Sequence, residues 1–234
     1  MDPYVYEGTD VLINKMNIRN AEKLIDVEAQ LFIANVLDIQ TIVQQIDFRT
    51  HKSLQMIHRH LFEEIYTWAG EYRTVNIYKS EQVLNGLSIN YSEKSQIIFD
   101  LQKVFAWANQ IQWNNDNPNL KEDFSRLMID LWRIHPFREG NTRTVSIFMK
   151  LFAETNHIYF KNEILANHPG YLRKSLVLAA VEEAPEPVYL FRMLGDALNE
   201  SSSHDTSDEE RANQYKVIKQ YDVSKYNEKP FETE

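Results

Sequence analysis

The chain has 234 residues, 43% of them apolar and 25% charged, a composition typical of a globular protein long enough to bury its own core. It contains no cysteine, which excludes disulfide frameworks, thiolate metal sites and cysteine nucleophiles. A formal net charge of -9 disfavours nucleic-acid binding, which needs clustered basic residues. No stretch is apolar enough to span a membrane, and the N-terminus lacks the features of a secretory signal. We therefore expect a soluble, cytoplasmic protein.

Long periodic segments between few glycines and prolines favour a helical protein. Residues 20–47 are predicted to form one or two helices, with Asn20 as the N-cap of the first. Residues 50–67 are predicted to form another helix, which ends near Gly70 because glycine commonly follows helix ends. The apolar stripe of this second segment comprises Leu54, Ile57, His58, Leu61, Phe62 and Ile65.

Residues 71–79 alternate between two faces, which is typical of a strand, and residues 82–90 form a second extended piece. We expect these two pieces to pair as a small β-hairpin. Residues 201–212 are polar and are expected to be a linker, after which residues 213–228 regain some helical periodicity. Further helices are predicted over residues 91–109, 120–134, 142–155, 170–182 and 187–199.

A short polar loop, residues 135–141, joins two of these apolar helices. Within it, Gly140 allows a backbone conformation that other residues resist. The next helix begins at Asn141 or Thr142, where unpaired N–H groups and the helix dipole favour an anion. Arg143 can add a bidentate contact to a phosphate. The pattern indicates a site for phosphate groups.

Two further groups in this loop suit phosphate chemistry. Glu139 supplies a hard oxygen for magnesium shared with phosphates. His135 titrates near neutrality and is a candidate general base. Together these residues indicate phosphoryl or nucleotidyl transfer by positioning and charge neutralisation. The alternative is an ordinary polar connection between helices, with His135 as a capped loop residue.

The run from His135 to Arg143, HPFREGNTR, resembles the signature of the Fic family, H-x-F-x-[D/E]-G-N-x-R, at every specified position. Residues 2–15 resemble the N-terminal extension of that family, and residues 57–77 resemble its helix-into-flap segment. The resemblance implies an all-α fold, the Fic fold, with a small β-hairpin flap beside the active-site loop. It divides the chain into an N-terminal helical extension (1–40), a Fic core (41–200), a polar linker (201–212) and a C-terminal inhibitory helix with a tail (213–234).

Most characterised Fic proteins transfer AMP from ATP to a hydroxyl of a target protein, so the resemblance implies a protein adenylyltransferase acting on Ser, Thr or Tyr. His135 would deprotonate the target hydroxyl, and Glu139 would hold Mg²⁺. The implied nucleotide-binding residues are Gly140, Asn141, Thr142 and Arg143, with Lys79 at the end of the flap as a further candidate. The flap would pair with an extended segment of the target through Arg73, Thr74, Val75, Asn76 and Ile77. Neither nucleic acid nor membrane is an implied partner, and self-association stays open.

The sequence departs from the fullest Fic motif at two positions. Many members have Gly where Thr142 stands and a second Arg where Ser146 stands. The missing guanidinium would help to orient the terminal phosphates, so another nucleotide or phosphate donor, or removal of AMP, stays open. A non-catalytic binding module that docks partners through the flap is the third alternative.

Residues 218–228 resemble the C-terminal form of an inhibitory helix, S/T-x-x-x-E-G/N, that occurs in many Fic proteins. Ser224 and Glu228 would share one helical face, although Lys229 replaces the usual Gly or Asn. The resemblance implies that Glu228 enters the nucleotide site and holds activity down, with an ordinary solvated tail as the alternative. Tyr226 on the same segment is a candidate for self-modification, because a tethered hydroxyl has a high effective concentration.

Overall fold

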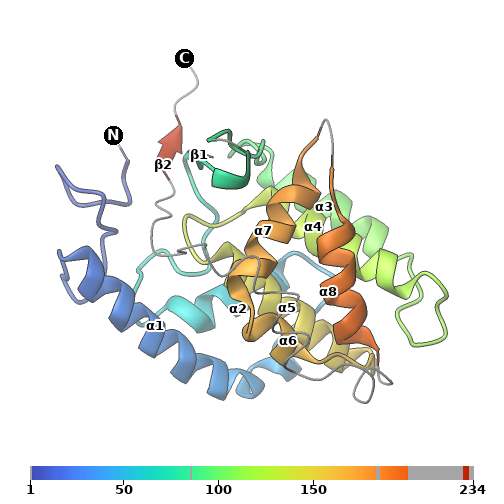
Figure 1. Cartoon of the computed structure of the whole chain (residues 1–234). Coiled ribbons are helices and arrows are strands. Elements are labelled where there is room, and N and C mark those ends of the chain that lie inside the picture. The colour runs from blue at the N-terminus through green and yellow to red at the C-terminus, as the bar shows by residue number, and fades with distance from the viewer. Residues whose placement is uncertain (1, 85, 183–184, 200–228, 232–234) are drawn as a thin grey trace.

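A computed structural model describes residues 2–84, 86–182, 185–199 and 229–231. In these residues, helices surround one hydrophobic core, and a two-stranded sheet lies at one edge (Figure 1). No helix among them is long and apolar enough to cross a membrane. The α-helices are α1 (Ala21–Asp38), α2 (Lys52–Phe62), α3 (Ile97–Ala108), α4 (Leu120–Ile134), α5 (Asn141–Thr155), α6 (Asn162–Ala166), α7 (Pro169–Ala180) and α8 (Val188–Leu198). The 3-10 helices are Ile39–Thr41, Val43–Gln45 and Gln82–Leu84, and the strands are β1 (Asn76–Tyr78) and β2 (Lys229–Phe231).

The all-α prediction is confirmed, with differences at helix ends. Asn20 caps α1, since its Oδ1 accepts the N–H of Lys23 at 2.8 Å. α2 ends at Phe62, well before the predicted stop at Gly70, because residues 63–70 form turns instead. α3 begins later than predicted, because residues 94–96 form a turn, in which the N–H of Lys94 donates to the Asn76 side chain at 2.8 Å. The sequence analysis missed α6, and the predicted linker and C-terminal helix, with Ser224, Tyr226 and Glu228, lie outside the described residues.

The predicted β-hairpin is wrong. Residues 82–90 contain a 3-10 turn, and β1 pairs instead with β2 in an antiparallel arrangement, with Ile77 opposite Pro230. The side chain of Glu81 is fully buried and forms an ion pair with Arg173 of α7 at 2.8 Å. The backbone of Glu81 also closes a tight turn, because its N–H donates to the carbonyl oxygen of Leu87 at 3.0 Å. The turn brings residues 86–88 back beside the end of β1, since the N–H of Lys79 donates to the hydroxyl of Ser88 at 3.1 Å, but the strand pairing of β1 is with β2.

α4 and α5 lie at the centre of the molecule and hold the active-site loop between them. α4 contacts α3, α5, α7 and α8, and α5 also packs against α2. Burying each large apolar side chain stabilises the fold by about 1.5–3 kcal/mol, so both ends of the loop are firmly anchored. The buried side chains include Phe124, Leu127, Met128, Leu131 and Trp132 of α4, and Val145, Phe148, Leu151 and Phe152 of α5.

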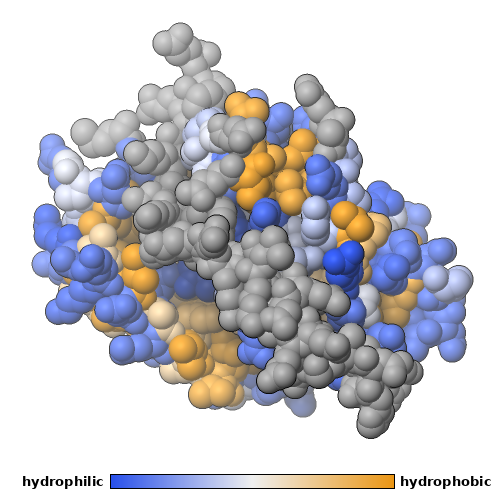
Figure 2. Space-filling view, viewed as in Figure 1, coloured by the Kyte–Doolittle hydropathy of each residue, from blue (hydrophilic) through white to orange (hydrophobic). Residues whose placement is uncertain are grey.

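α1 lies along the lower edge of the molecule in the view of Figure 1. Apolar atoms gather on the surface over its C-terminal half (Figure 2), where Ile33 is 60% exposed and Leu37 is 82% exposed. Of the residues of α1, only Leu24 is fully buried. α1 packs against the core through Leu24 and through half-buried side chains such as Val27 and Phe32, and it lies against α2.

His58 fastens α2 to the active-site loop. Its Nδ1 accepts the N–H of Gly70 at 2.8 Å, so Nε2 carries the proton and donates to the carbonyl oxygen of Glu139 at 3.0 Å. The ring stacks on Phe137, with 3.9 Å between the ring centroids. Burial lowers the pKa of His58 to about 3. Neutral His58 is therefore part of the folded structure at physiological pH.

Gly140 lets the loop lie directly on α2. Its φ angle is +78°, a conformation that side-chain-bearing residues rarely adopt. A Cβ atom on this residue would lie 2.6 Å from two ring carbons of Phe62. Two separate constraints, backbone conformation and space, therefore require glycine here.

We expect Gly140→Ala to lower the free energy of unfolding by about 3 kcal/mol, because backbone strain adds to a steric overlap. Gly8→Ala is the matched control, since Gly8 has a φ angle of +73° and no atom within 4 Å of an added Cβ. The control should lose only the strain contribution, about 1 kcal/mol. Urea denaturation of both variants tests this, and equal losses would contradict the close packing of Gly140 on Phe62.

A second prediction concerns pH. The pKa of His58 is about 3 in the fold, against an ordinary value of 6.5, so the unfolded chain binds one more proton between these values. The contribution of His58 to stability therefore falls as the pH is lowered from 6.5 towards 3, by about 1.4 kcal/mol per pH unit. His58→Gln should flatten the pH dependence of urea denaturation between pH 4 and pH 7. The control is His60→Gln on the same helix, and an unchanged slope in His58→Gln would refute the assignment.

Candidate active site

A cleft of about 460 Å³ opens along the loop between α4 and α5, a volume in the range of small-molecule sites. Its walls come from the N-terminal segment, α1, the active-site loop with the start of α5, and α7, together with Tyr66 after α2 and Lys79 after β1. The structure brings together in this cleft the six predicted residues Lys79, Glu139, Gly140, Asn141, Thr142 and Arg143.

His135 follows the last residue of α4 and adopts a left-handed conformation, with a φ angle of 51°. Its Nδ1 lies 3.1 Å from the carbonyl oxygen of Trp132. Because a carbonyl oxygen only accepts, we assign the proton to Nδ1 and the lone pair to Nε2. The ring is fully buried against Tyr91, with 4.3 Å between the centroids, and it does not line the cleft. The candidate base is thus oriented, but it is covered in this conformation.

The side chain of Arg73 supports the flap segment from inside the molecule, and the docking of a target through residues 73–77 stays a prediction. This side chain is buried and donates to main-chain carbonyl oxygens, including that of His135 at 2.8 Å and that of Val75 at 2.7 Å. Arg73 therefore ties the flap segment to the base, and its side chain cannot face a partner. Thr74 is also held internally, because its N–H donates to the hydroxyl of Tyr4 at 3.0 Å. Among the predicted flap residues, only Asn76 and Ile77 belong to β1, the strand that pairs with β2.

Asn141 shapes the loop through its side chain. The amide accepts the N–H of Phe137 and donates to the carbonyl oxygen of Phe137, both at 2.8 Å. The residue is 2% exposed, so this amide is occupied inside the loop. What α5 offers to an anion is therefore its first-turn N–H groups and its dipole.

The sequence analysis missed Glu28. The guanidinium of Arg143 lies 2.5 Å from a carboxylate oxygen of Glu28 on α1 and 3.4 Å from one of Glu139. Burial alone would lower the pKa of Arg143, but these two carboxylates outweigh it and raise the pKa. The available signal was a glutamate inside the apolar stripe of α1, four positions from both Leu24 and Phe32.

Glu28 also accepts the hydroxyl of Tyr66. Burial, and then the negative charge of Glu28, raise the pKa of Tyr66, so its hydroxyl stays protonated and donates. Glu28 is therefore fixed between a neutral donor and a cation, on the wall of the cleft.

Asp2 is a second residue that sequence reasoning missed. Its carboxylate forms an ion pair with Arg138 of the loop at 2.8 Å, and the two side chains are only 6% and 4% exposed. No local pattern marks this contact, which joins residues 136 positions apart. The ion pair thus ties the N-terminal segment, whose residues 10–12 line the cleft, to the loop.

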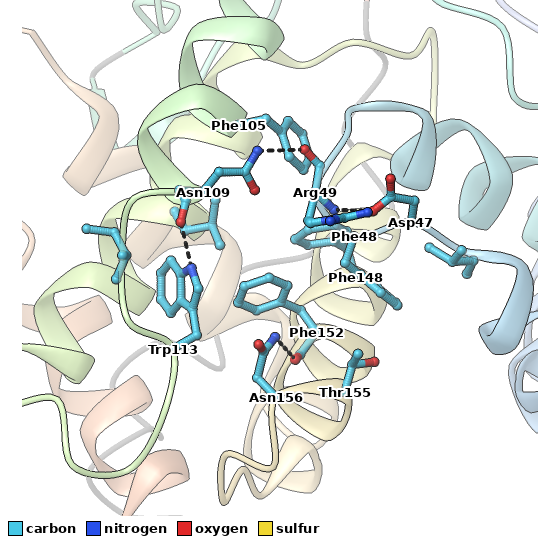
Figure 3. A pocket seen from close by; sticks show the side chains of 14 residues that line it. Asp47, Phe48, Arg49, Phe105, Asn109, Trp113, Phe148, Phe152, Thr155 and Asn156 are labelled. Atoms are coloured by element: carbon cyan, nitrogen blue, oxygen red, sulfur yellow. Dashed lines mark hydrogen bonds and ion pairs between the residues drawn. The ribbon is translucent and has the colours of Figure 1, made fainter.

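A second cavity, of about 390 Å³, lies between α3 and α5 (Figure 3). Aromatic rings line it, and its polar side chains bind neighbouring main-chain groups, as Asn109 does with the carbonyl oxygen of Arg49 at 3.0 Å. It contains none of the predicted functional residues. The cleft beside the loop is therefore the candidate active site.

Residues 48–153 match the family model described as Fic/DOC family. A probable protein adenylyltransferase Fic of Escherichia coli is 27% identical over 170 residues, which cover 73% of this chain and 74% of that protein. A probable protein adenylyltransferase y4lH of Sinorhizobium fredii is 28% identical over 150 residues, which cover 64% of this chain and 74% of that protein.

Solved structures show the same fold. The N-terminal FIC domain of Bep8 from Bartonella sp. 1-1C has a TM-score of 0.68 at 18% identity and covers 86% of this chain and 97% of its own. BepC from Bartonella tribocorum, solved with bound AMPPNP, has a TM-score of 0.66 at 20% identity and covers 82% and 95%. The signature loop, the family-model match and the helical architecture agree that residues 48–153 form a Fic/DOC family domain.

Proposed function

We propose that this protein is an adenylyltransferase that moves AMP from ATP to a Ser, Thr or Tyr hydroxyl of a target protein. The observation that carries the proposal is the fixed tautomer of His135, whose acceptor nitrogen belongs to the same short loop as the phosphate-binding groups. The relatives named as protein adenylyltransferases support the choice of reaction.

In this reaction, Nε2 of His135 takes the proton of the target hydroxyl, and the hydroxyl oxygen attacks the α-phosphorus of ATP. The bond from that phosphorus to the bridging oxygen of the β-phosphate breaks, and pyrophosphate leaves. The first-turn N–H groups of α5 and the guanidinium of Arg143 stabilise the negative charge of the phosphate chain. Arg73 holds the backbone of His135 in place during the proton transfer.

Glu139 would hold Mg²⁺ together with the phosphates. Its carboxylate lines the cleft and is 27% exposed, and hard oxygen ligands shared with phosphates suit this ion. The described residues contain no cluster of three or more His, Asp or Glu side chains that could hold a metal. The nucleotide, rather than further protein side chains, would therefore supply other ligands of Mg²⁺. The bound ion would neutralise part of the phosphate charge.

We propose further that β1 is the edge on which a target segment docks, and that the C-terminal residues of the chain limit access to it. An exposed strand edge accepts any extended segment through main-chain hydrogen bonds, and β2 is paired with β1 in this way. β1 directly precedes Lys79, which lines the cleft. Because His135 is buried, catalysis requires a rearrangement that uncovers it. Inhibition by Glu228, which the sequence resemblance implies, is a separate part of this proposal.

We expect His135→Ala to reduce AMP transfer about 10²–10⁴-fold, the usual contribution of a general base. Its affinity for ATP should stay close to that of the wild type, because the phosphate-binding groups are unchanged. Transfer is measured with labelled ATP and a cell lysate, and ATP affinity by calorimetry, with His60→Ala as the control. Undiminished labelling by His135→Ala would rule out this mechanism. Label from another nucleotide but none from ATP would favour the alternative donor.

The regulatory proposal is tested with two variants. A chain that ends after residue 228 lacks β2, and its target labelling should rise about fivefold if docking of the strand is worth about 1 kcal/mol. Glu228→Gly retains β2 and tests the inhibitory carboxylate alone, with increased labelling expected. A rise in only one variant assigns the inhibition to that feature. If neither variant gains activity, both forms of inhibition are excluded, whatever the result for His135.

A further inference from the structure

The hydroxyl of Thr142 is surrounded by donors. Its Oγ1 accepts the indole N–H of Trp132 at 2.9 Å and an N–H of the Arg173 guanidinium at 3.3 Å. Indole and guanidinium groups can donate hydrogen bonds but cannot accept them. Both lone pairs of the Thr142 hydroxyl are therefore engaged, and its own proton must point elsewhere.

Burial holds the two donors in these positions. Trp132 is fully buried, and Arg173 is 8% exposed. Arg173 is fixed further by its ion pair with the buried Glu81 at 2.8 Å and by its position over the Trp132 ring, 5.3 Å from the centroid. Neither donor can turn away to water, so the orientation of the Thr142 hydroxyl is imposed by its surroundings.

Among the described residues, no acceptor takes the proton of Thr142, and Thr142 lines the cleft. We infer that Thr142 donates this proton to a phosphate oxygen of the bound nucleotide, with Trp132 and Arg173 as the positioning residues. This inference rests on the proposed function, because it requires a nucleotide in the cleft.

The position of Thr142 at the start of α5 favours phosphate as the acceptor. Thr142 is the second residue of α5, in the turn where N–H groups and the helix dipole attract negative charge. Arg143 is adjacent, and Lys79 also lines the cleft. An uncharged acceptor on the sugar or base would gain less from these groups. The chain thus has a donor at a position where many Fic proteins have glycine, and it lacks the second arginine of those proteins at Ser146.

The first test compares Thr142→Val with Thr142→Ser in the full-length chain, by calorimetric titration with ATP and with adenosine. Thr142→Val removes the hydroxyl and should weaken ATP binding about tenfold, the usual effect of losing a hydrogen bond to a charged group. Adenosine binding should not change. Thr142→Ser keeps the hydroxyl and should restore ATP affinity to within about threefold of the wild type.

The outcomes distinguish failure of the proposed function from failure of the inference about Thr142. A wild type that binds no ATP would refute the proposed function itself. A wild type that binds ATP, with equal affinity in Thr142→Val, would refute only the inference about Thr142. Equal weakening of ATP and adenosine would also overturn it, because the contact would then not be to phosphate. Thermal melting of each variant reports folding, and Thr142→Gly provides a second hydroxyl-free variant if Thr142→Val fails to fold.

Trp132→Phe tests the positioning role. This change keeps an aromatic ring but removes the N–H, so the Thr142 hydroxyl can rotate. We expect KM for ATP to rise about threefold with kcat unchanged, because the contact is made in the ground state as well. In the Thr142→Val background, the same change should add no further rise in KM. Independent, additive effects of the two substitutions would show that Trp132 acts only on packing and would refute its positioning role.

Discussion

The hydrogen bond from the His58 ring to the carbonyl oxygen of Glu139 joins α2 to the active-site loop, and the geometry of the site depends on it. It requires a neutral imidazole, which burial enforces. The same ring stacks on Phe137, whose backbone is closed into the loop by the Asn141 amide. One buried side chain thus holds the backbone of Glu139 and the ring of Phe137, and through Phe137 the turn that leads into α5.

Ion pairs surround the cleft, and each joins the loop or its supports to a distant part of the chain. Asp2 pairs with Arg138, Glu28 pairs with Arg143, and a third pair joins Glu81 to Arg173. Removing one partner of a buried pair is strongly destabilising, because the remaining charge is left uncompensated. The carboxylates thus hold the cations of the cleft in defined positions, and an anionic ligand must share Arg143 with Glu28. The ion pairs therefore fix the positions of these cations but weaken their attraction for an anionic ligand.

Local patterns predicted the helices and the loop, because both are encoded within a few neighbouring residues. The helical periodicity of α4 and α5 and the polar run between them were sufficient to predict the two helices and the loop that lines the cleft. The pairing of β1 with β2 joins segments far apart in sequence, so no local pattern could reveal it. The position of Glu28 in the apolar stripe of α1 marks it as unusual, but its partner Arg143 lies too far along the chain for a local pattern to identify. The hairpin prediction failed because residues 82–84 form a 3-10 turn and β1 pairs with the distant β2.

The hydrogen-bonding state of each polar group separates residues that build the site from residues that act in it. Asn141 and Arg73 use their donors on main-chain groups and therefore fix geometry. His135 has its proton assigned to Nδ1, which makes Nε2 the basic atom. Thr142 has its acceptor capacity filled, which makes its hydroxyl an obligatory donor. The signature alone does not make this distinction, because it specifies Asn141 and leaves the position of Thr142 open; the contacts around each side chain do.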